Sequence, residues 1–359
     1  MIEIFTIISG IFVPLSFFNL EFKKKELIIV LILIFGIIFF DGLRWEMGTD
    51  WFNYLKNFQD INIRWTPGFE FGFQIYTQFI SLLTENYSIY LFITSFLFYI
   101  GIFYNSYKIS GNSFITLFLL FATITWYSGG QRQMLACAIF LFSIKYIINR
   151  NLTLFLILSF LGLSFHITFI VLIPFYFIYG MSNRKFYLTI LLLIVLSHFI
   201  YPIIEQFANF FNFFNPGKDL TERFDGGLET SAIFGFGRKI VTTIPVIYFY
   251  HLKPDIKNNI KIRFFYHLSL FSIFIYILGF NYIGILASRL DIYFGIISLA
   301  IFLGLIQSKL KVKQHKIFLI IFCFFLAILH YSRLADWGMS LYHPYSSIFY
   351  NYYLNRVLF

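Results

Sequence analysis

Charged residues are scarce in this sequence. Only 12% of its 359 residues are charged, whereas 59% are hydrophobic. A soluble domain is typically about one-quarter charged, so this chain has too few charged side chains to cover a water-facing surface. We therefore interpret it as a polytopic integral membrane protein and exclude an ordinary soluble domain.

Several motifs that carry cofactors or metals are also missing. The two cysteines, Cys137 and Cys323, lie inside apolar segments and form no CxxC motif, which predicts two inert buried thiols. There is no P-loop and no GxGxxG motif opening a soluble βαβ unit, so nothing indicates a nucleotide site. There is also no HExxH motif, no Cys/His cluster and no DxD-like pair. The sequence therefore predicts no cofactor and no metal ion.

The net charge of +10 does not indicate a nucleic-acid partner. The lysines lie in short connectors between apolar runs, where basic side chains set membrane orientation and contact anionic headgroups. The charge pattern therefore predicts the lipid bilayer as the partner and excludes nucleic acid.

What the sequence does contain is a long series of apolar runs. Backbone polar groups in lipid must be paired within the segment, so we expect these runs to be helices. Several are shorter than the ~20 residues that cross a bilayer unaided. The runs fall at 4–20, 27–43, 69–83, 87–104, 113–128, 131–149, 152–164, 166–180, 186–204, 239–252, 262–280, 284–306 and 316–332. They predict an all-α fold with about 12 transmembrane helices in a single domain, 1–359.

The run at 69–83 differs from the others because it contains Glu70, Gln74 and Gln78. We expect it to form a re-entrant or interfacial helix. The other twelve runs then alternate so that the lysine-rich connectors share one side, which is cytoplasmic by the positive-inside rule. This topology places 41–68 and 205–238 in extracytoplasmic loops and both termini outside, and we expect short helices in an outer loop.

Charged residues inside membrane segments cost ~2.5–3.5 kcal/mol each at the bilayer centre and are therefore candidates for function. Arg132 begins one helix in GGQRQM, and Arg289 lies near the start of another in ASRLDIYF. The expected topology places them at outer helix ends, with His166 in SFHITF. The neighbouring outer segments add Arg44, Asp50 and Glu70. The pattern predicts a single outward-facing polar cavity.

Each of these residues has a functional and a structural interpretation. An arginine at a helix N-terminus opposes the macrodipole but suits a bound anion, which favours function for Arg132. Arg289 shares a helix face with Tyr293, four residues later, or pairs with a carboxylate elsewhere. Asp50 and Glu70 are catalytic groups or salt-bridge partners of the arginines. Several arginines with few carboxylates favour a phosphate or diphosphate ligand.

Four stretches carry a resemblance to a known family. They are Arg44, Gly48, Thr49, Asp50 and Tyr54; Glu70, Gly72 and Phe73; Gly130, Arg132, Gln133 and Ala136 with Phe165 and His166; and Arg289, Leu290, Tyr293 and Phe294 with Pro344 and Tyr345. In this order the chain resembles the EpsG-like proteins, a branch of the Wzy-type O-antigen and exopolysaccharide polymerases. Thr168 stands where the family has serine, and 205–238 matches no part of the pattern.

The resemblance implies a glycosyltransferase of polysaccharide biosynthesis. Such an enzyme transfers a glycan from undecaprenyl diphosphate to a lipid-linked repeat unit, with inversion and without a metal. The implied partners are undecaprenyl-diphosphate-linked oligosaccharides and a chain-length regulator protein. The implied location is the inner (plasma) membrane, with the active site facing the periplasm or outside.

The resemblance and the charges together suggest roles for the site residues. We expect Arg132 and Arg289 to hold the donor diphosphate, with Arg44 or Arg238 assisting and Gln133 and Tyr293 as further substrate contacts. His166, Asp50 or Glu70 would serve as the catalytic base. Two other classes stay open at this stage: a lipid-linked oligosaccharide flippase or other transporter, and a membrane O-acyltransferase that uses His166.

Overall fold

The structure is a computed structural model. It describes residues 2–18, 26–48, 50–127, 129–196, 230–282, 284–335 and 346–347. Within these residues the chain is helical and contains no strand, apart from an isolated antiparallel bridge between Arg44 and Ser347. The all-α prediction is confirmed for this part of the chain.

The chain forms two compact units. Unit 1 comprises Met1–Ile170 with Leu310–Phe359, and unit 2 comprises Val171–Lys309. The single transmembrane domain over 1–359 stays a prediction.

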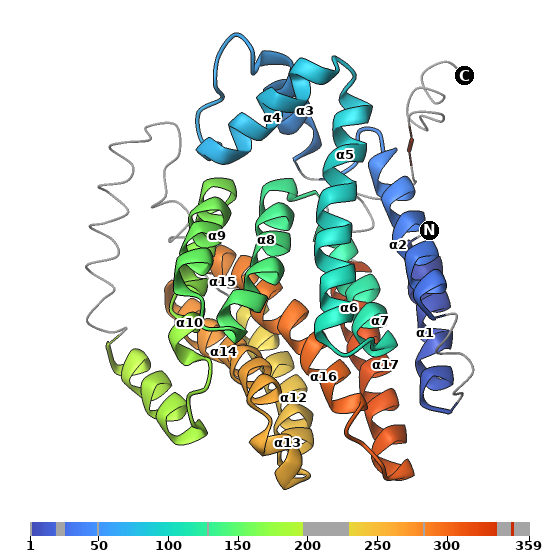
Figure 1. The fold of residues 1–359 in the computed structure, drawn as a ribbon, viewed down its shortest axis with the longest axis vertical. Helices are drawn as coiled ribbons and strands as arrows, with labels where there is room; N and C mark the ends of the chain where they lie inside the picture. Colours follow the sequence, from blue (N-terminus) through green and yellow to red (C-terminus); the bar gives the residue numbers. More distant parts are fainter. Residues whose placement is uncertain are drawn as a thin grey trace. The chain divides into compact units, whose positions relative to one another are not determined.

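Unit 1 is built mainly from the first nine α-helices and the last. Its elements are α1 (Ile2–Phe18), α2 (Glu26–Gly42), α3 (Trp51–Asp60), α4 (Phe71–Leu83), α5 (Tyr87–Tyr99), the π-helix η2 (Ile100–Tyr104), α6 (Asn105–Ile109), α7 (Phe114–Thr123), the 3-10 helix η3 (Ile124–Tyr127), α8 (Gln131–Ile148), α9 (Leu152–Phe165) and α17 (Lys313–Ala335). Helix α8 packs against α5 and α9. Helices α3 and α4 lie beyond the ends of α8 and α9 and beside the upper turns of α5 (Figure 1).

Unit 2 is built around α14. Its elements are α10 (Phe175–Ile178), a helix over 183–196, α12 (Thr230–His251), α13 (Pro254–Asn258), α14 (Ile260–Tyr282), α15 (Gly284–Asp291), the π-helix η6 (Ile292–Ser298) and α16 (Leu299–Gln307). Helix α14 contacts α12, α15, η6 and α16. Helices α15, η6 and α16 follow one another without a break, so they form one long helix whose middle part is a wider π-helix.

Five helices in the described part of the chain are long and apolar enough to cross a membrane. They are Tyr87–Ile109, Gln131–Ile148, Ile260–Ile277, Arg289–Gln307 and Lys313–His330. The chain is thus a membrane protein, but about 12 spans are not confirmed. Helices α1 and α2 have 17 residues each, α9 has 14 and α7 has 10, so each is shorter than the usual span of about 20 residues.

The clearest differences from the predicted helices are at 166–180 and at the start of α12. The run at 166–180 forms the 3-10 helix η4 (Ile167–Leu172) and the single turn α10, where a longer helix was predicted. Pro174 explains the break, because proline lacks an N–H group and clashes with the preceding turn. Helix α12 begins at Thr230, inside the predicted loop 205–238. The sequence did not indicate its first turns, because two glycines and Arg238 interrupt the apolar pattern there. The rest of that loop, 205–229, lies outside the described residues.

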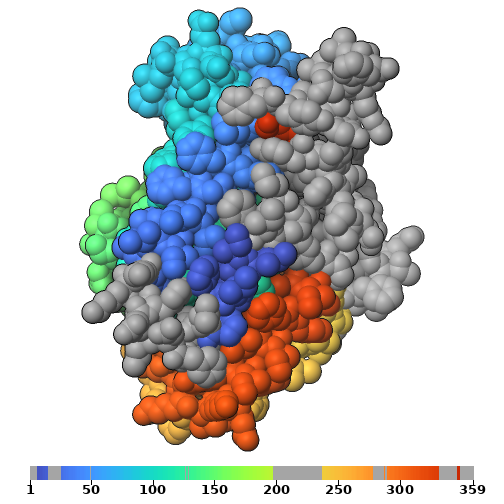
Figure 2. Space-filling view, turned by 90° about the vertical axis from the view of Figure 1, so that its right-hand side faces the viewer, coloured from blue at the N-terminus to red at the C-terminus, as the bar shows by residue number. Residues whose placement is uncertain are grey.

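Apolar side chains cover an outer face of unit 1. On α2, Ile28, Ile32 and Phe39 are each more than half exposed, at helical spacing. Ile321 and Ile328 are similarly exposed on α17, and both helices lie at the surface in Figure 2. Such a surface would be unfavourable in water and suits lipid contact.

Candidate active site

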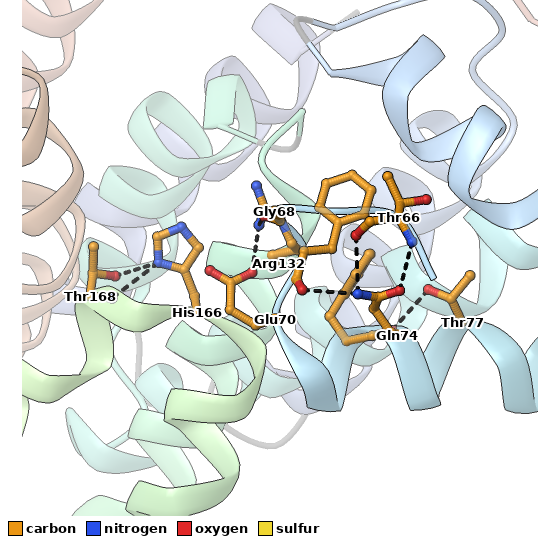
Figure 3. A network of polar contacts seen from close by, with 10 residues as sticks. Thr66, Gly68, Glu70, Gln74, Thr77, Arg132, His166 and Thr168 are labelled. Carbon is orange, nitrogen blue, oxygen red and sulfur yellow. Dashed lines mark hydrogen bonds and ion pairs between the residues drawn. The ribbon is translucent and has the colours of Figure 1, made fainter. Parts of the chain in front are cut away.

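An ion pair between Arg132 and Glu70 is the centre of the polar network in unit 1. Arg132 lies in the first turn of α8, and its Nη1 donates to Glu70 Oε2 at 2.5 Å and to the Gly68 carbonyl at 3.2 Å (Figure 3). The guanidinium also lies over the Phe69 ring, 4.5 Å from its centroid. The two charged side chains are only 12% and 20% exposed, so both charges are largely removed from solvent.

The loop that carries Glu70 is fixed by Gln74 on α4. The amide oxygen of Gln74 accepts from the Thr66 N–H at 3.0 Å, and its nitrogen donates to the carbonyls of Thr66 and Phe69 at 3.1 and 3.0 Å (Figure 3). These three bonds satisfy loop groups that would otherwise be unpaired beside an apolar helix. Gln74 therefore sets the position of both Gly68 and Glu70, a role that the sequence pattern did not assign.

Glycine allows α4 and α9 to approach closely at this site. A Cβ atom on Gly72 would lie 2.1 Å from Ser164 Oγ and 2.7 Å from Ser164 Cβ, so a larger residue cannot fit. The Tyr76 and Phe165 rings are 5.9 Å apart at the same interface. Because Glu70 immediately precedes α4 and His166 caps the C-terminus of α9, this contact places the two at the meeting point of the helices (Figure 3).

The backbone fixes the tautomer of His166. Its side chain is buried, and Nδ1 lies 2.7 Å from Thr168 Oγ1 and accepts the Thr168 backbone N–H at 3.3 Å. An N–H group can only donate, so Nδ1 must be the unprotonated nitrogen of a neutral ring. The ring proton then sits on Nε2. His166 is therefore arranged as a hydrogen-bond donor through Nε2.

Tyr54 links α3 to Arg132. Asp50 is the N-cap residue of α3, and Tyr54 follows one turn later with its ring stacked on Phe69 at 5.6 Å. Burial raises the pKa of Tyr54, and Asp50 raises it further, although the charge and hydrogen bonding of Arg132 oppose both effects. The phenol therefore remains protonated beside the guanidinium, and Tyr54, Arg132 and Glu70 belong to one connected group, with the charge of Asp50 acting on Tyr54.

Arg44 lies in a different environment. It is 2% exposed and forms an ion pair with Asp41, whose carboxylate also accepts a hydrogen bond from Ser95 Oγ at 2.9 Å. The adjacent Trp45 N–H donates to the Ser346 carbonyl at 3.1 Å, which joins this stretch to the C-terminal part of the chain. These contacts support a structural role for Arg44.

Two glutamines flank Arg132 on α8, and both are buried. Gln133 was a sequence candidate, whereas Gln131 was not. Gln131 Oε1 accepts from the Tyr90 hydroxyl at 3.3 Å, and its Nε2 has no hydrogen-bond partner among the described residues. Its position directly before a motif arginine is the sequence signal that could have identified it.

The remaining candidates belong to unit 2. Arg238 lies on α12, Arg289 on α15 and Tyr293 on η6. The shared face of Arg289 and Tyr293 was predicted from α-helical spacing, but η6 begins between them and widens the turn. Convergence of these residues with Arg132 on one cavity stays a prediction. The motif residues Thr49, Pro344 and Tyr345 lie outside the described residues.

Comparison with known proteins identifies the family. A model of the EpsG family matches residues 27–347, which is most of the chain and includes every motif above. No curated protein and no solved structure matches the chain. The chain therefore belongs to the EpsG family, and this membership implies a membrane-embedded polysaccharide polymerase of the glycosyltransferase type.

Proposed function

We propose that this protein polymerises a cell-surface polysaccharide, of the O-antigen or exopolysaccharide kind. It takes a glycan from undecaprenyl diphosphate and transfers it to a lipid-linked repeat-unit acceptor, with inversion at the anomeric carbon and without a metal ion. The reaction takes place at the outer face of the inner (plasma) membrane. Family membership supports the class of reaction, and the surroundings of Arg132 support the kind of donor.

The arrangement of Arg132 is the observation that carries the proposal. Its Nη1 is engaged by Glu70 and Gly68, but its buried Nε has no hydrogen-bond partner among the described residues. The N-cap of α8 is Gly130, which has no side chain to cap the first N–H groups. A guanidinium and a helix N-terminus together suit a multiply charged oxyanion such as a diphosphate.

The chemistry follows from where charge develops. An acceptor hydroxyl oxygen forms a bond to the anomeric carbon of the donor glycan, while the bond from that carbon to the diphosphate oxygen breaks. The electron pair leaves with undecaprenyl diphosphate, so negative charge grows on the diphosphate in the transition state. Arg132 stabilises that charge, and Arg289 is proposed as the second guanidinium with Arg238 assisting.

A carboxylate is the better base for the hydroxyl proton. His166 presents Nε2–H when its Nδ1 accepts the Thr168 N–H, so we assign it as a hydrogen-bond donor to a substrate oxygen. Glu70 or Asp50 then accepts the proton from the attacking hydroxyl. A diphosphate that binds Arg132 competes with Glu70, which frees the Glu70 carboxylate when the donor is in place.

Both substrates are lipid-linked, and the outer face is where such repeat units are used. The positive-inside rule favours this orientation, because the lysine-rich connectors then lie in the cytoplasm. Proposed partners are undecaprenyl-diphosphate-linked oligosaccharides and a chain-length regulator protein. Neither a flippase nor an O-acyltransferase is favoured by a specific observation.

Complementation of a polymerase-deficient strain tests the proposal. Arg132→Ala and Arg289→Ala are each expected to abolish long-chain polysaccharide at normal protein levels. Loss of one hydrogen-bond donor that stabilises the negative charge of a transition state lowers the rate by about 10²–10³-fold. Arg64→Ala is the matched control, since Arg64 is exposed and, among the described residues, pairs only with the neighbouring Asp60. Long chains from both the Arg132 and the Arg289 variants would contradict the proposal.

A further inference from the structure

The exposed side chains of α4 are all apolar. They are Phe71, Ile75, Phe79, Leu82 and Leu83, which share one side of the helix and are between 45% and 74% exposed. We call them the apolar face of α4. The helix contains no charged residue. A contiguous apolar surface of this kind marks a place where lipid or another protein makes contact.

The polar residues of α4 point the other way. Gln74 and Thr77 are buried. Gln74 bonds to the loop that carries Glu70, and Thr77 Oγ1 donates to the Phe73 carbonyl at 2.9 Å. A surface helix of a water-soluble protein has its polar side outside, so α4 is built for an apolar surrounding.

The preceding helix, α3, has an outer face of the opposite kind. Beside Phe52, its exposed side chains are polar, namely Asn53, Lys56 and Gln59. Helices α3 and α4 are in contact with each other. The surroundings therefore change from water to an apolar medium between the outer faces of two neighbouring helices.

The position of α4 identifies the apolar medium as the membrane. Tyr87–Ile109 and Gln131–Ile148 are long and apolar enough to cross a membrane, and both begin at the end of unit 1 where α4 lies (Figure 1). Helix α4 also packs against α9, on which Ile157 and Phe160 are more than half exposed. The apolar surface of α9 thus continues onto α4.

The length and side chains of α4 exclude two other arrangements. Its 13 residues extend about 20 Å, which is too short for the ~30 Å hydrocarbon core, and its axis runs obliquely to those of α8 and α9 (Figure 1). Membrane helices of separate chains pack mainly through small residues, whereas the apolar face of α4 carries only phenylalanine, leucine and isoleucine. Lipid therefore fits this face better than a second copy of the chain.

We propose that α4 lies in the plane of the membrane, with its apolar face in the lipid and α3 on the water side. Glu70 directly precedes α4 and pairs with Arg132, so this contact sets the depth of the ion pair near the lipid headgroups. A diphosphate on a lipid carrier lies at the same depth. The consequence for the site rests on the proposed function, but the lipid contact itself does not.

Spin labels on the purified protein in liposomes of phosphatidylethanolamine and phosphatidylglycerol test the contact. Ile75→Cys and Leu82→Cys place labels on the apolar face, and Lys56→Cys on α3 is the matched control. We expect the two α4 labels to respond more strongly to oxygen, which concentrates in lipid, than to a water-soluble nickel complex. The label on α3 should respond in the opposite way. The unsubstituted chain gives the background, since Cys137 and Cys323 are buried.

Two results would overturn the lipid contact. Labels on α4 that respond to the nickel complex as strongly as the label on α3 would place the apolar face in water. Labels that are shielded from both reagents would show that protein covers this face, such as a second copy of the chain.

Phe79→Asp tests the consequence for the site. Because a carboxylate is unfavourable in lipid, a label at Ile75→Cys in this variant should become several-fold more accessible to the nickel complex. Polymerisation of an undecaprenyl-diphosphate-linked repeat unit in liposomes should fall about tenfold, since small displacements of a site are costly in rate. Gln59→Asp adds the same charge to the exposed side of α3 and should change neither quantity.

Phe79→Asn makes the same test more mildly if the charged variant does not accumulate. Full activity in a Phe79 variant whose label has moved into water would overturn the link between α4 and the depth of the site. Unsubstituted protein that transfers no glycan, while its α4 labels lie in lipid, would refute the proposed function and leave the lipid contact standing.

Discussion

At the scale of single residues, two motif arginines are each paired with a carboxylate but lie at different positions relative to a helix. Arg44 is almost completely buried and paired with Asp41, so its loss would leave an unpaired charge at a cost of about 3–5 kcal/mol. Arg132 lies at a helix N-terminus and shares a single nitrogen between Glu70 and Gly68. A substitution at Arg44 should therefore affect folding, whereas one at Arg132 should affect chemistry.

Two substitutions at His166 distinguish a hydrogen-bond donor from a catalytic base. In His166→Gln the amide nitrogen can replace the Nε2–H donor but cannot take up a proton. We expect this variant to keep a substantial part of the wild-type kcat, whereas His166→Ala should lose most of it, by about 10²-fold. Steady-state kinetics with purified protein would measure both. Equal loss in the two variants would contradict the role of His166 as a hydrogen-bond donor.

The sequence could locate these residues but could not pair them. Arg132, Glu70 and His166 were identified because helix starts, polar breaks and the family pattern mark them in a single sequence. Which carboxylate meets which arginine depends on how α3 and α4 lie over α8, and periodicity contains no such information. The tautomer of His166 was likewise inaccessible, because it depends on a backbone N–H two residues away.

At the scale of helices, the contact between α4 and α9 holds Glu70, a proposed base, near His166, the proposed hydrogen-bond donor. Gly72→Ala would drive a methyl group into Ser164 and separate the two helices. We expect at least a tenfold fall in activity, since a displacement of about 1 Å can cost 10²-fold in rate. Gly72→Ala/Ser164→Gly should recover part of it, because the obstructing side chain is then absent.

Gly237→Ala is the matched control for this substitution. A Cβ atom there would meet no described atom within 4 Å, and alanine favours helix formation over glycine. Activity assays and thermal unfolding would compare the variants. Normal activity in Gly72→Ala would show that the close α4–α9 contact does not position the site.

Helix boundaries were mostly predictable, and the exceptions have physical causes. The apolar run at 131–149 became α8 (Gln131–Ile148) almost unchanged, because it combines a clear start at Gly130 with continuous apolar character. The run at 166–180 did not form one helix, because Pro174 divides it. Helix α3 was hidden inside a polar loop, where its aromatic residues indicated only an interface.

At the scale of the whole molecule, composition determined the class and the family match determined the reaction type. The scarcity of charge predicted a helical membrane protein, and the described helices agree. The number of spans was less accessible, because hydropathy alone does not separate a 17-residue helix from a full span. Donor, acceptor and orientation are proposals that only the intact protein in lipid can test.

The most direct test is polymerisation by the purified protein. It would be incubated in lipid with an undecaprenyl-diphosphate-linked repeat unit and EDTA, and the products separated on a ladder gel. We predict a ladder of products that differ by one repeat unit, unaffected by EDTA and absent for Arg132→Ala. A wild-type reaction that leaves the substrate unextended, or a full ladder from Arg132→Ala, would contradict the account.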